Sequence, residues 1–281
     1  MTIKLIGYPA LGPTTKVIIT LKELGIPYEL DPPASFQSLK DDDYIKNKHP
    51  FGKIPVLFDG DFRITESRAI CRYLASKYQG KYNDTILLPN DVHQASLVDQ
   101  YISYESFYYD PPLSKIVYQE KVAKKFFDKD PDLEVIKENR EELAKVLDVF
   151  EKLLEGKEYL NGEYSLADLF ICPNTNYVYC IDTHSDLWDS RPNVKNWWNR
   201  LCNRDSIKTT FEEIKSKYNN TILVTHDIRE VGLVEQFISY ESSYDDTPVS
   251  KIVFQELYVN YIGSTLDPAI IKQDREKLMK F

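Results

Sequence analysis

One stretch, residues 49–78, constrains the fold more than any other part of the chain. It reads HPFGKIPVLFDGDFRITESRAICRYLASKY. These letters predict a β-hairpin over residues 56–64, in which the apolar strand VLF is followed by a tight turn at DGD and the return strand FRI. The bond between Ile54 and Pro55, directly before the hairpin, is a candidate cis peptide. The stretch therefore predicts a strand pair with a prolyl turn at its entrance.

A helix is expected directly after this hairpin. Thr65 is its predicted N-cap, which places Glu66 and Ser67 in the first helical turn. Backbone N–H groups at a helix start favour an anion, because they have no acceptor within the helix. The strand edge, the prolyl bond and the helix start converge on one spot, which can hold an extended peptide with a free carboxylate.

Strands and helices alternate in the first part of the chain, and helices alone follow. Apolar runs predict strands at residues 3–8 and 26–30 on either side of a helix. A strand–helix–strand unit of this length implies a right-handed parallel crossover. Together with the hairpin it makes a four-stranded mixed sheet, which is a thioredoxin-like arrangement. We therefore expect an α/β domain over residues 1–81 and an all-helical domain over residues 91–215.

The composition limits the possible partners and compartments. The formal net charge is −9, from 35 Lys and Arg against 44 Asp and Glu, and the lack of a basic block argues against a nucleic-acid partner. No run approaches the roughly 18 apolar residues needed to cross a membrane. The four cysteines show neither C-x-x-C nor metal-ligand spacing, which favours a reduced, cytoplasmic setting without a metal.

Four runs of the sequence together resemble the glutathione transferases. The stretch at 49–78 is similar to their glutathione-binding half, and the phi-like branch of plants and fungi is nearest in wording. Upstream, IKLIGYPALGPTTKVIITLKELGIPYEL looks like the opening strand, helix and strand of that family. Downstream, ENREELAKVLDVFEKLLEGKEYLNGEYSLADLFICPNTNY and DSRPNVKNWWNRLCNRDS look like its helical domain. The resemblance covers roughly residues 3–215.

The resemblance implies both a fold and an activity. The fold is an N-terminal thioredoxin-like domain that binds glutathione, followed by the all-helical C-terminal domain of glutathione transferases. The activity is attack of the glutathione thiolate on small apolar electrophiles, which is a detoxification reaction with glutathione as co-substrate. The resemblance also implies a homodimer.

Six residues match family positions that bind glutathione, a peptide with a γ-glutamyl end, a central cysteine and a glycine carboxylate. Glu66 would meet the ammonium of the γ-glutamyl end, and Ser67 its carboxylate. The backbone of Ile54 would pair with the cysteinyl backbone by strand addition. Lys40 and Lys53 stand where phi relatives usually carry histidine and glutamine, and both can bind the glycine carboxylate. The six residues are Lys40, Lys53, Ile54, Pro55, Glu66 and Ser67.

The group that activates the thiol departs from the family pattern. A free thiol has a pKa near 8.5, so a neighbouring donor must stabilise the thiolate, which is the nucleophile. Phi relatives use a serine after the first strand, and Leu11 occupies that position here. Tyr8 is the best substitute, because tyrosine-type branches carry their catalytic hydroxyl at that place. Thr14 and Thr15, at the start of the following helix, are the next candidates.

The second substrate is expected in an apolar pocket against the helical domain. Phe107, Tyr108 and Tyr118 match pocket-facing positions of the family, and Leu11 and Phe36 could face the same pocket from the first domain. An aromatic stripe of this kind is also typical of a helical core, so both interpretations stay open for each residue.

A capping box is predicted at the start of one helix of the second domain. Ser165 and Asp168 have the spacing of this motif, in which the first side chain accepts from a backbone N–H and the second reaches back. We interpret the pair as part of the folding machinery and not of the chemistry.

The chain contains a partial internal repeat. Residues 82–120 align without gaps on residues 218–256, with 23 identities in 39 positions, and the match continues to Phe281 opposite Val146. The segment 218–281 thus repeats the first helical hairpin, residues 82–146, and lacks a glutathione-binding half. It either docks on its own chain or exchanges with the hairpin of a partner, or it is a remnant of a tandem gene with little function.

The sequence thus favours a glutathione transferase over two other readings. The alternative is a glutathione- or ligand-binding relative with weak or no turnover, and Leu11 is the feature that favours it. Disulfide exchange on a thioredoxin-like fold is a more distant possibility, because the first cysteine is Cys71, far from the thiol position.

Overall fold

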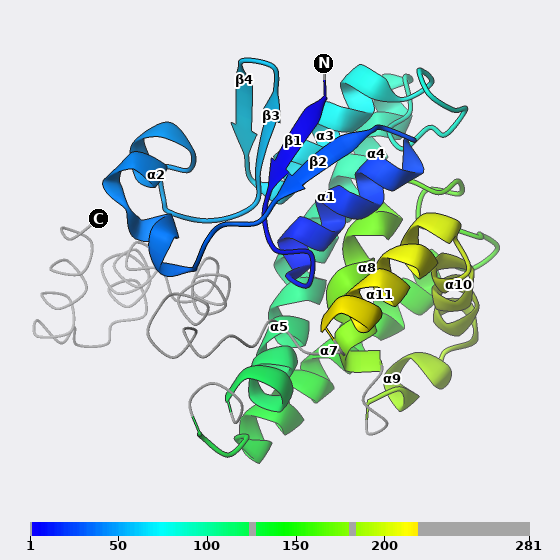
Figure 1. Cartoon of the computed structure of the whole chain (residues 1–281). Coiled ribbons are helices and arrows are strands. Elements are labelled where there is room, and N and C mark those ends of the chain that lie inside the picture. Colours follow the sequence, from blue (N-terminus) through cyan, green and yellow to red (C-terminus); the bar gives the residue numbers. More distant parts are fainter. Residues whose placement is uncertain (1, 124–127, 180–183, 219–281) are drawn as a thin grey trace, which may run out of the picture. The chain divides into compact units, whose positions relative to one another are not determined.

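The computed structural model describes residues 2–123, 128–179 and 184–218. The first part of the chain forms a mixed β-sheet flanked by helices (Figure 1). The strand order is β2-β1-β3-β4, with β1 parallel to β2 and the other two pairs antiparallel. The strands are β1 (Ile3–Ile6), β2 (Tyr28–Asp31), β3 (Val56–Asp59) and β4 (Phe62–Thr65). This arrangement confirms the predicted four-stranded, thioredoxin-like sheet.

Helix α1 is the central element between the sheet and the later helices. It packs on α3 and also contacts α8 and α11 (Figure 1). Pro13 suits its first turn, where a missing N–H is tolerated, and Gly25 follows its end with a φ of +65°. The helices of this first part are α1 (Gly12–Glu23), the 3₁₀ turn η1 (Gln37–Lys40), α2 (Asp42–Asn47) and α3 (Ser67–Tyr78).

From residue 92 onward the described ranges are helical, apart from two isolated β-bridges within residues 159–163. This confirms the expected all-helical second part. In these ranges no helix combines the length and the apolar character that crossing a membrane requires. The elements are α4 (Val92–Tyr104), η2 (Glu105–Tyr109), α5 (Asp110–Val117), η3 (Tyr118–Ala123), α7 (Leu133–Leu153), α8 (Leu166–Tyr179), α9 (Asp186–Asp189), α10 (Pro192–Cys202) and α11 (Asp205–Tyr218).

The N-cap of α3 differs from the sequence prediction. Thr65 does not cap α3, because it pairs with Val56 as the last residue of β4. Glu66 is the N-cap instead. Its backbone φ is +67°, in the left-handed region that residues other than glycine rarely adopt. The peptide bond between Ile54 and Pro55 is cis, as predicted.

The capping box at the start of α8 is present and does more than cap one helix. Asp168 is fully buried, and its Oδ2 accepts from the Ser165 N–H at 3.0 Å and from the Ser165 hydroxyl at 3.1 Å. Its Oδ1 accepts from the Leu160 N–H at 3.0 Å and from the Trp197 indole N–H at 2.9 Å. The serine hydroxyl thus donates instead of accepting, and the carboxylate ties α8 to α10 and to the preceding loop.

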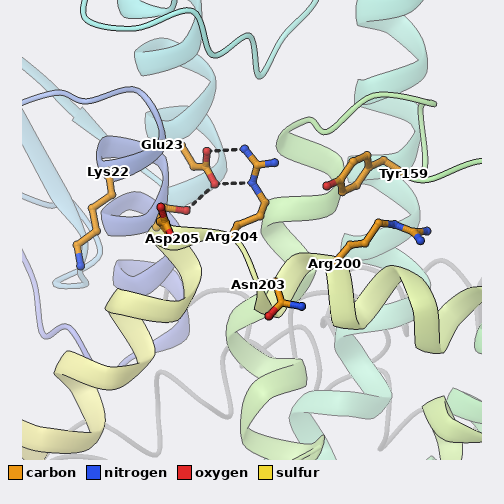
Figure 2. Close-up of a pocket in the computed structure, with 8 residues that line it drawn as sticks. Lys22, Glu23, Tyr159, Arg200, Asn203, Arg204 and Asp205 are labelled. Atoms are coloured by element: carbon orange, nitrogen blue, oxygen red, sulfur yellow. Dashed lines mark hydrogen bonds and ion pairs between the residues drawn. The ribbon is translucent and has the colours of Figure 1, made fainter.

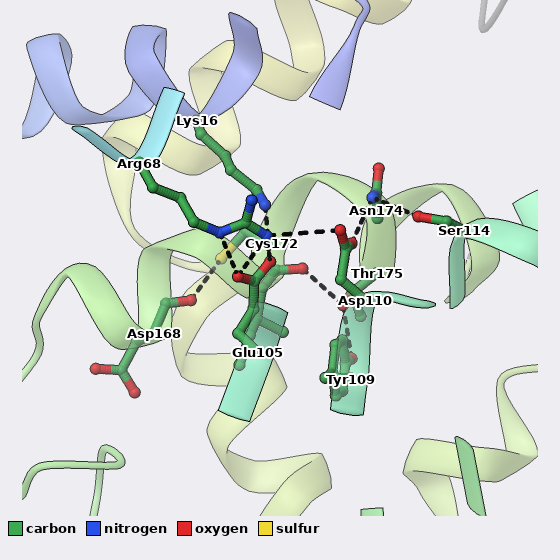
Figure 3. A network of polar contacts seen from close by, with 11 residues as sticks. Lys16, Arg68, Glu105, Tyr109, Asp110, Ser114, Asp168, Cys172, Asn174 and Thr175 are labelled. Atoms are coloured by element: carbon green, nitrogen blue, oxygen red, sulfur yellow. Dashed lines mark hydrogen bonds and ion pairs between the residues drawn. The ribbon is translucent and has the colours of Figure 1, made fainter. Parts of the chain in front are cut away.

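A buried ion cluster, which sequence reasoning missed, joins the two parts of the chain (Figure 3). Lys16 of α1 lies 2.7 Å from Glu105 of η2, and each side chain is only 1% exposed. Arg68 of α3 donates to both carboxylate oxygens of Glu105 at 2.7–2.9 Å. Asp110 lies 3.6 Å from the same guanidinium and accepts from the Asn174 side chain at 2.7 Å. Charges from α1 and α3 therefore fix the position of the η2–α5 segment.

The repeat expected over residues 218–281 lies outside the described residues, apart from Tyr218 at the end of α11. Its role and the domain boundaries stay predictions.

Candidate functional site

The strand register brings the predicted site together. Ile6 pairs with Val56, and the two strands are antiparallel, so the chain that leaves β1 runs beside the residues that enter β3. Val56 pairs on its other side with Thr65, the last residue before the start of α3. The β1–α1 loop, the Ile54–Pro55 bond and the α3 N-terminus therefore meet at one edge of the sheet, as the sequence predicted.

The start of α3 carries two of the proposed glutathione ligands in different environments. The Glu66 side chain is 70% exposed, so its carboxylate can meet a ligand in solvent. Ser67 is buried as the first residue of the helix, beside N–H groups that have no intrahelical acceptor. The positive φ of Glu66 is a strained conformation of a kind that clusters at binding sites.

His49 lies next to Glu66 without neutralising it. Burial lowers the pKa of His49 to about 4, and the nearby cations Lys53 and Arg63 lower it further in the same direction. The imidazole is therefore neutral at pH 7. Its Nδ1 accepts from the Phe51 N–H at 3.2 Å, so Nε2 carries the proton, 3.7 Å from Glu66. His49 therefore places no positive charge beside the Glu66 carboxylate.

Lys40 and Lys53 are brought together by a close approach of two loops. Gly52 has a φ of +60°, and a Cβ at that position would stand 2.5 Å from the Leu39 carbonyl oxygen and 3.3 Å from the Lys40 side chain. The Tyr44 hydroxyl donates to the Lys53 carbonyl at 2.9 Å and fixes the chain just before the cis bond. Burial lowers the pKa of Lys53, Glu66 raises it and Lys40 lowers it, so these three charges face one another.

The hydroxyls proposed to activate the thiol are all engaged or enclosed. Tyr8 is buried, burial raises its pKa, and its hydroxyl donates to the Pro33 carbonyl at 2.8 Å. Thr14 is fully buried, and its hydroxyl has no hydrogen-bond partner among the residues described. The Thr15 hydroxyl reaches the carbonyls of Pro9 at 2.7 Å and Leu11 at 2.9 Å.

Leu11 is the N-cap of α1 and supplies no side-chain hydrogen bond to the helix. It is only 5% exposed. Its loop is held from the second part of the chain, because the Tyr177 hydroxyl of α8 donates to the Ala10 carbonyl at 2.5 Å. A leucine thus stands where α1 begins and where the resemblance requires a hydroxyl.

The residues proposed for the second-substrate pocket differ widely in exposure. Phe36 is buried against the Tyr8 ring, with 4.7 Å between ring centroids. Phe107 is 51% and Tyr108 60% exposed, whereas Tyr118 is partly buried. Tyr108 lines an apolar groove of about 320 Å³ between the α4–η2 segment and α7. The assignment of Leu11, Phe36, Phe107, Tyr108 and Tyr118 to one pocket stays a prediction.

A larger cavity of about 560 Å³ lies at the other end of α1 and is lined by charged side chains (Figure 2). There Glu23 accepts from Arg204 through both carboxylate oxygens at 2.7 and 2.8 Å and from the Ser206 hydroxyl at 2.5 Å. These groups satisfy one another and join α1 to the start of α11. A helix of 12 residues separates this cavity from Leu11 by about 18 Å, so it does not belong to the predicted glutathione site.

Comparison with known proteins identifies the family. The sequence profile described as glutathione S-transferase, N-terminal domain, matches residues 5–82, and the C-terminal domain profile matches residues 109–205. Glutathione S-transferase F13 of Arabidopsis thaliana is 34% identical over 208 residues, which cover 74% of this chain and 94% of that protein. The chain belongs to the glutathione S-transferase family.

Solved structures of phi-type relatives share the fold of this glutathione transferase. Glutathione transferase F7 from Populus trichocarpa is 35% identical with a TM-score of 0.70, covering 75% of this chain and 98% of its own. Glutathione S-transferase I from mais, solved in complex with an atrazine glutathione conjugate, is 32% identical with a TM-score of 0.70, covering 76% and 99%. The chain is a phi-like glutathione transferase, an enzyme that joins the glutathione thiolate to electrophiles.

Proposed function

We propose that this glutathione transferase acts in the cytoplasm as a homodimer that detoxifies small apolar electrophiles. The observation that carries the proposal is the edge at which the Ile54–Pro55 bond, the α3 start and the pair Lys40 and Lys53 converge. It carries a carboxylate, on Glu66, for the ammonium of glutathione and two cations, Lys40 and Lys53, for the glycine carboxylate.

Each end of glutathione then has a binding group. Glu66 binds the ammonium of the γ-glutamyl end, and Ser67 with the α3 N-terminus binds the neighbouring carboxylate. The cysteinyl backbone pairs with Ile54, next to Pro55. The glycine carboxylate reaches Lys40 and Lys53. Burial lowers the pKa of Lys53, and the negative charge of the bound carboxylate raises it again.

Tyr8 is the hydroxyl that we propose for thiol activation, with Thr14 as the second choice. The register of β1 and β3 ends at the pair Ile6 and Val56, and Tyr8 follows two residues later in the loop that would border the cysteinyl residue of the bound peptide. Its raised pKa keeps the phenol protonated at pH 7, so that it can donate. To reach the thiolate, its hydroxyl must leave the Pro33 carbonyl. The alternative of a binding protein with weak turnover keeps its support from Leu11.

The electrophile is proposed to be small and apolar. Leu11 and Phe36 supply apolar surface from the first part of the chain, and Phe107, Tyr108 and Tyr118 supply it from the η2–η3 region. The relative from mais that holds an atrazine glutathione conjugate supports a site that accommodates an electrophile-derived group beside glutathione.

Exposed apolar residues support the homodimer. Phe51 is 69% exposed before β3, and Val149 is 52% exposed beside the apolar groove of α7. In a two-fold dimer, each such surface is used twice and is buried on both subunits. Sedimentation of the wild type and of the variant Phe51→Ser measures this, and a wild type that sediments as a monomer would contradict the proposal.

Retention on immobilised glutathione followed by a chlorodinitrobenzene-type conjugation assay tests the function. Ser67→Ala should weaken glutathione binding roughly 10-fold or more, because a hydrogen bond to a charged group is lost. Lys145→Ala, which removes an exposed charge on α7, is the matched control and should bind normally. Retention without turnover would favour the binding-protein alternative, and no retention would refute both.

A further inference from the structure

The position of the bound thiol follows from the sheet register. β1 and β3 run side by side up to the pair Ile6 and Val56, after which the chain turns away from the sheet into the β1–α1 loop. A peptide that pairs with the Ile54 backbone occupies the place that β1 leaves. Its central residue is therefore bordered by the loop over residues 7–11 and by the start of α1.

This border offers little to a negative charge. Residues 7–15 contain three hydroxyls, on Tyr8, Thr14 and Thr15. Tyr8 and Thr15 donate to backbone carbonyls, and Thr14 is enclosed against Gly7, where a Cβ would stand 2.6 Å from its Oγ1. Tyr8 can reach a thiolate only by leaving the Pro33 carbonyl without this hydrogen bond, which offsets part of the gain.

Leu11 makes the remaining contact apolar. Its side chain makes no capping hydrogen bond to α1, and Pro13 removes one of the N–H groups of the first turn. A thiolate beside Leu11 loses hydration and gains only the remaining backbone N–H groups. A thioether sulfur carries no charge, needs no donor, and gains contact for the carbon attached to it.

We propose that Leu11 makes this site select S-substituted glutathione, a thioether, over the glutathione thiolate. The inference rests on the proposed glutathione site and adds its ligand preference. The enzyme then holds conjugates at least as well as the free tripeptide, and the thiolate form binds least well.

The test compares S-methylglutathione with glutathione by isothermal titration at pH 6.5 and 9. The wild type should bind the methyl thioether about fourfold more tightly at pH 6.5, the effect of one buried methyl. The preference should grow at pH 9, because most of the free glutathione is then thiolate. The titration of protein groups, and of groups that both ligands share, affects both dissociation constants alike and cancels in their ratio.

Leu11→Ser should reverse the pH trend, and at pH 9 it should favour glutathione at least tenfold relative to the wild type, through a hydroxyl bond to the thiolate. Leu11→Ala removes the leucine without adding a donor and should keep the wild-type trend. Thermal unfolding checks that both variants are folded. A wild type whose preference for the thioether vanishes or falls at pH 9 overturns the inference while leaving the proposed function intact. Failure to bind either ligand at millimolar concentration overturns both.

Discussion

The buried cluster of Lys16, Arg68 and Glu105 leads to a quantitative prediction about stability. Glu105→Gln keeps the size of the side chain and removes its charge, so that a lysine that is 1% exposed loses the carboxylate 2.7 Å from its ammonium group. At an effective dielectric constant near 20, charges separated by 2.7 Å attract by about 6 kcal/mol. The buried lysine keeps its desolvation penalty, while the attraction that offset it is gone.

We therefore expect Glu105→Gln to lower the free energy of unfolding by about 3–5 kcal/mol. For a domain of this size each kcal/mol lowers Tm by roughly 2–4 °C, which gives a loss of roughly 6–20 °C. Lys16→Met should cost less than half as much, because Arg68 still pairs with both oxygens of Glu105. Urea unfolding, followed by circular dichroism and by tryptophan fluorescence, measures the change.

Two further variants make the reasoning refutable. Lys145→Met breaks an exposed ion pair with Glu142 and should change stability by about 0–1 kcal/mol. The double variant Lys16→Met with Glu105→Leu removes both buried charges of the closest pair and should be more stable than Glu105→Gln alone. If Glu105→Gln loses less than about 1 kcal/mol, or if Lys16→Met is the more damaging change, the cluster does not join the two parts of the chain as argued.

Other predictions concern the site. The pKa of His49 is lowered from 6.5 to about 4 by burial, so the unfolded chain binds a proton between these pH values that the folded chain does not. The contribution of His49 to the free energy of unfolding is full above pH 6.5 and falls by up to about 3 kcal/mol as the pH is lowered towards 4. Urea titrations of His49→Gln should therefore show a free energy of unfolding that depends less on pH. Gly52→Ala should weaken glutathione retention and destabilise the fold more than Gly156→Ala. Both glycines have a positive φ, but of the two only Gly52 would place its new Cβ against a carbonyl oxygen, that of Leu39 at 2.5 Å. Equal effects would contradict the close approach of the two loops. The conjugation rate of Leu11→Ser should reach its plateau at lower pH than that of the wild type, because the added hydroxyl can donate to the thiolate. Identical pH–rate profiles for these two proteins would show that Leu11 does not control the thiol.

Local sequence patterns were enough to predict the sheet and the convergence of the prolyl bond with the start of α3. The hairpin at 56–64, the cis bond before Pro55 and the capping box of Ser165 and Asp168 depend on neighbours within a few residues, and each was found where expected. The N-cap of α3 was misplaced by one residue, because pairing of Thr65 with Val56 extends the strand, and only the sheet register shows this.

Local patterns could not predict contacts between residues that are far apart in the sequence. Lys16 is separated from Glu105 by 89 positions, and its only signal in the sequence was a charge inside an apolar helix. The engagement of Tyr8 by the Pro33 carbonyl and the enclosure of Thr14 against Gly7 likewise depend on packing between segments. A side chain that looks available in the sequence can have its hydrogen bond used elsewhere in the fold.

The sequence by itself determined the family and the fold class and named the residues proposed for glutathione, because these depend on residue type, spacing and local backbone preference. Leu11 in place of a hydroxyl was also visible in the sequence. Only the tertiary structure decided which hydroxyls of the β1–α1 segment already have acceptors, where Lys40 approaches Lys53, and how α1 and α3 are tied to η2. The physical reason is that burial and pairing of a polar group depend on neighbours that the fold brings together from distant parts of the chain.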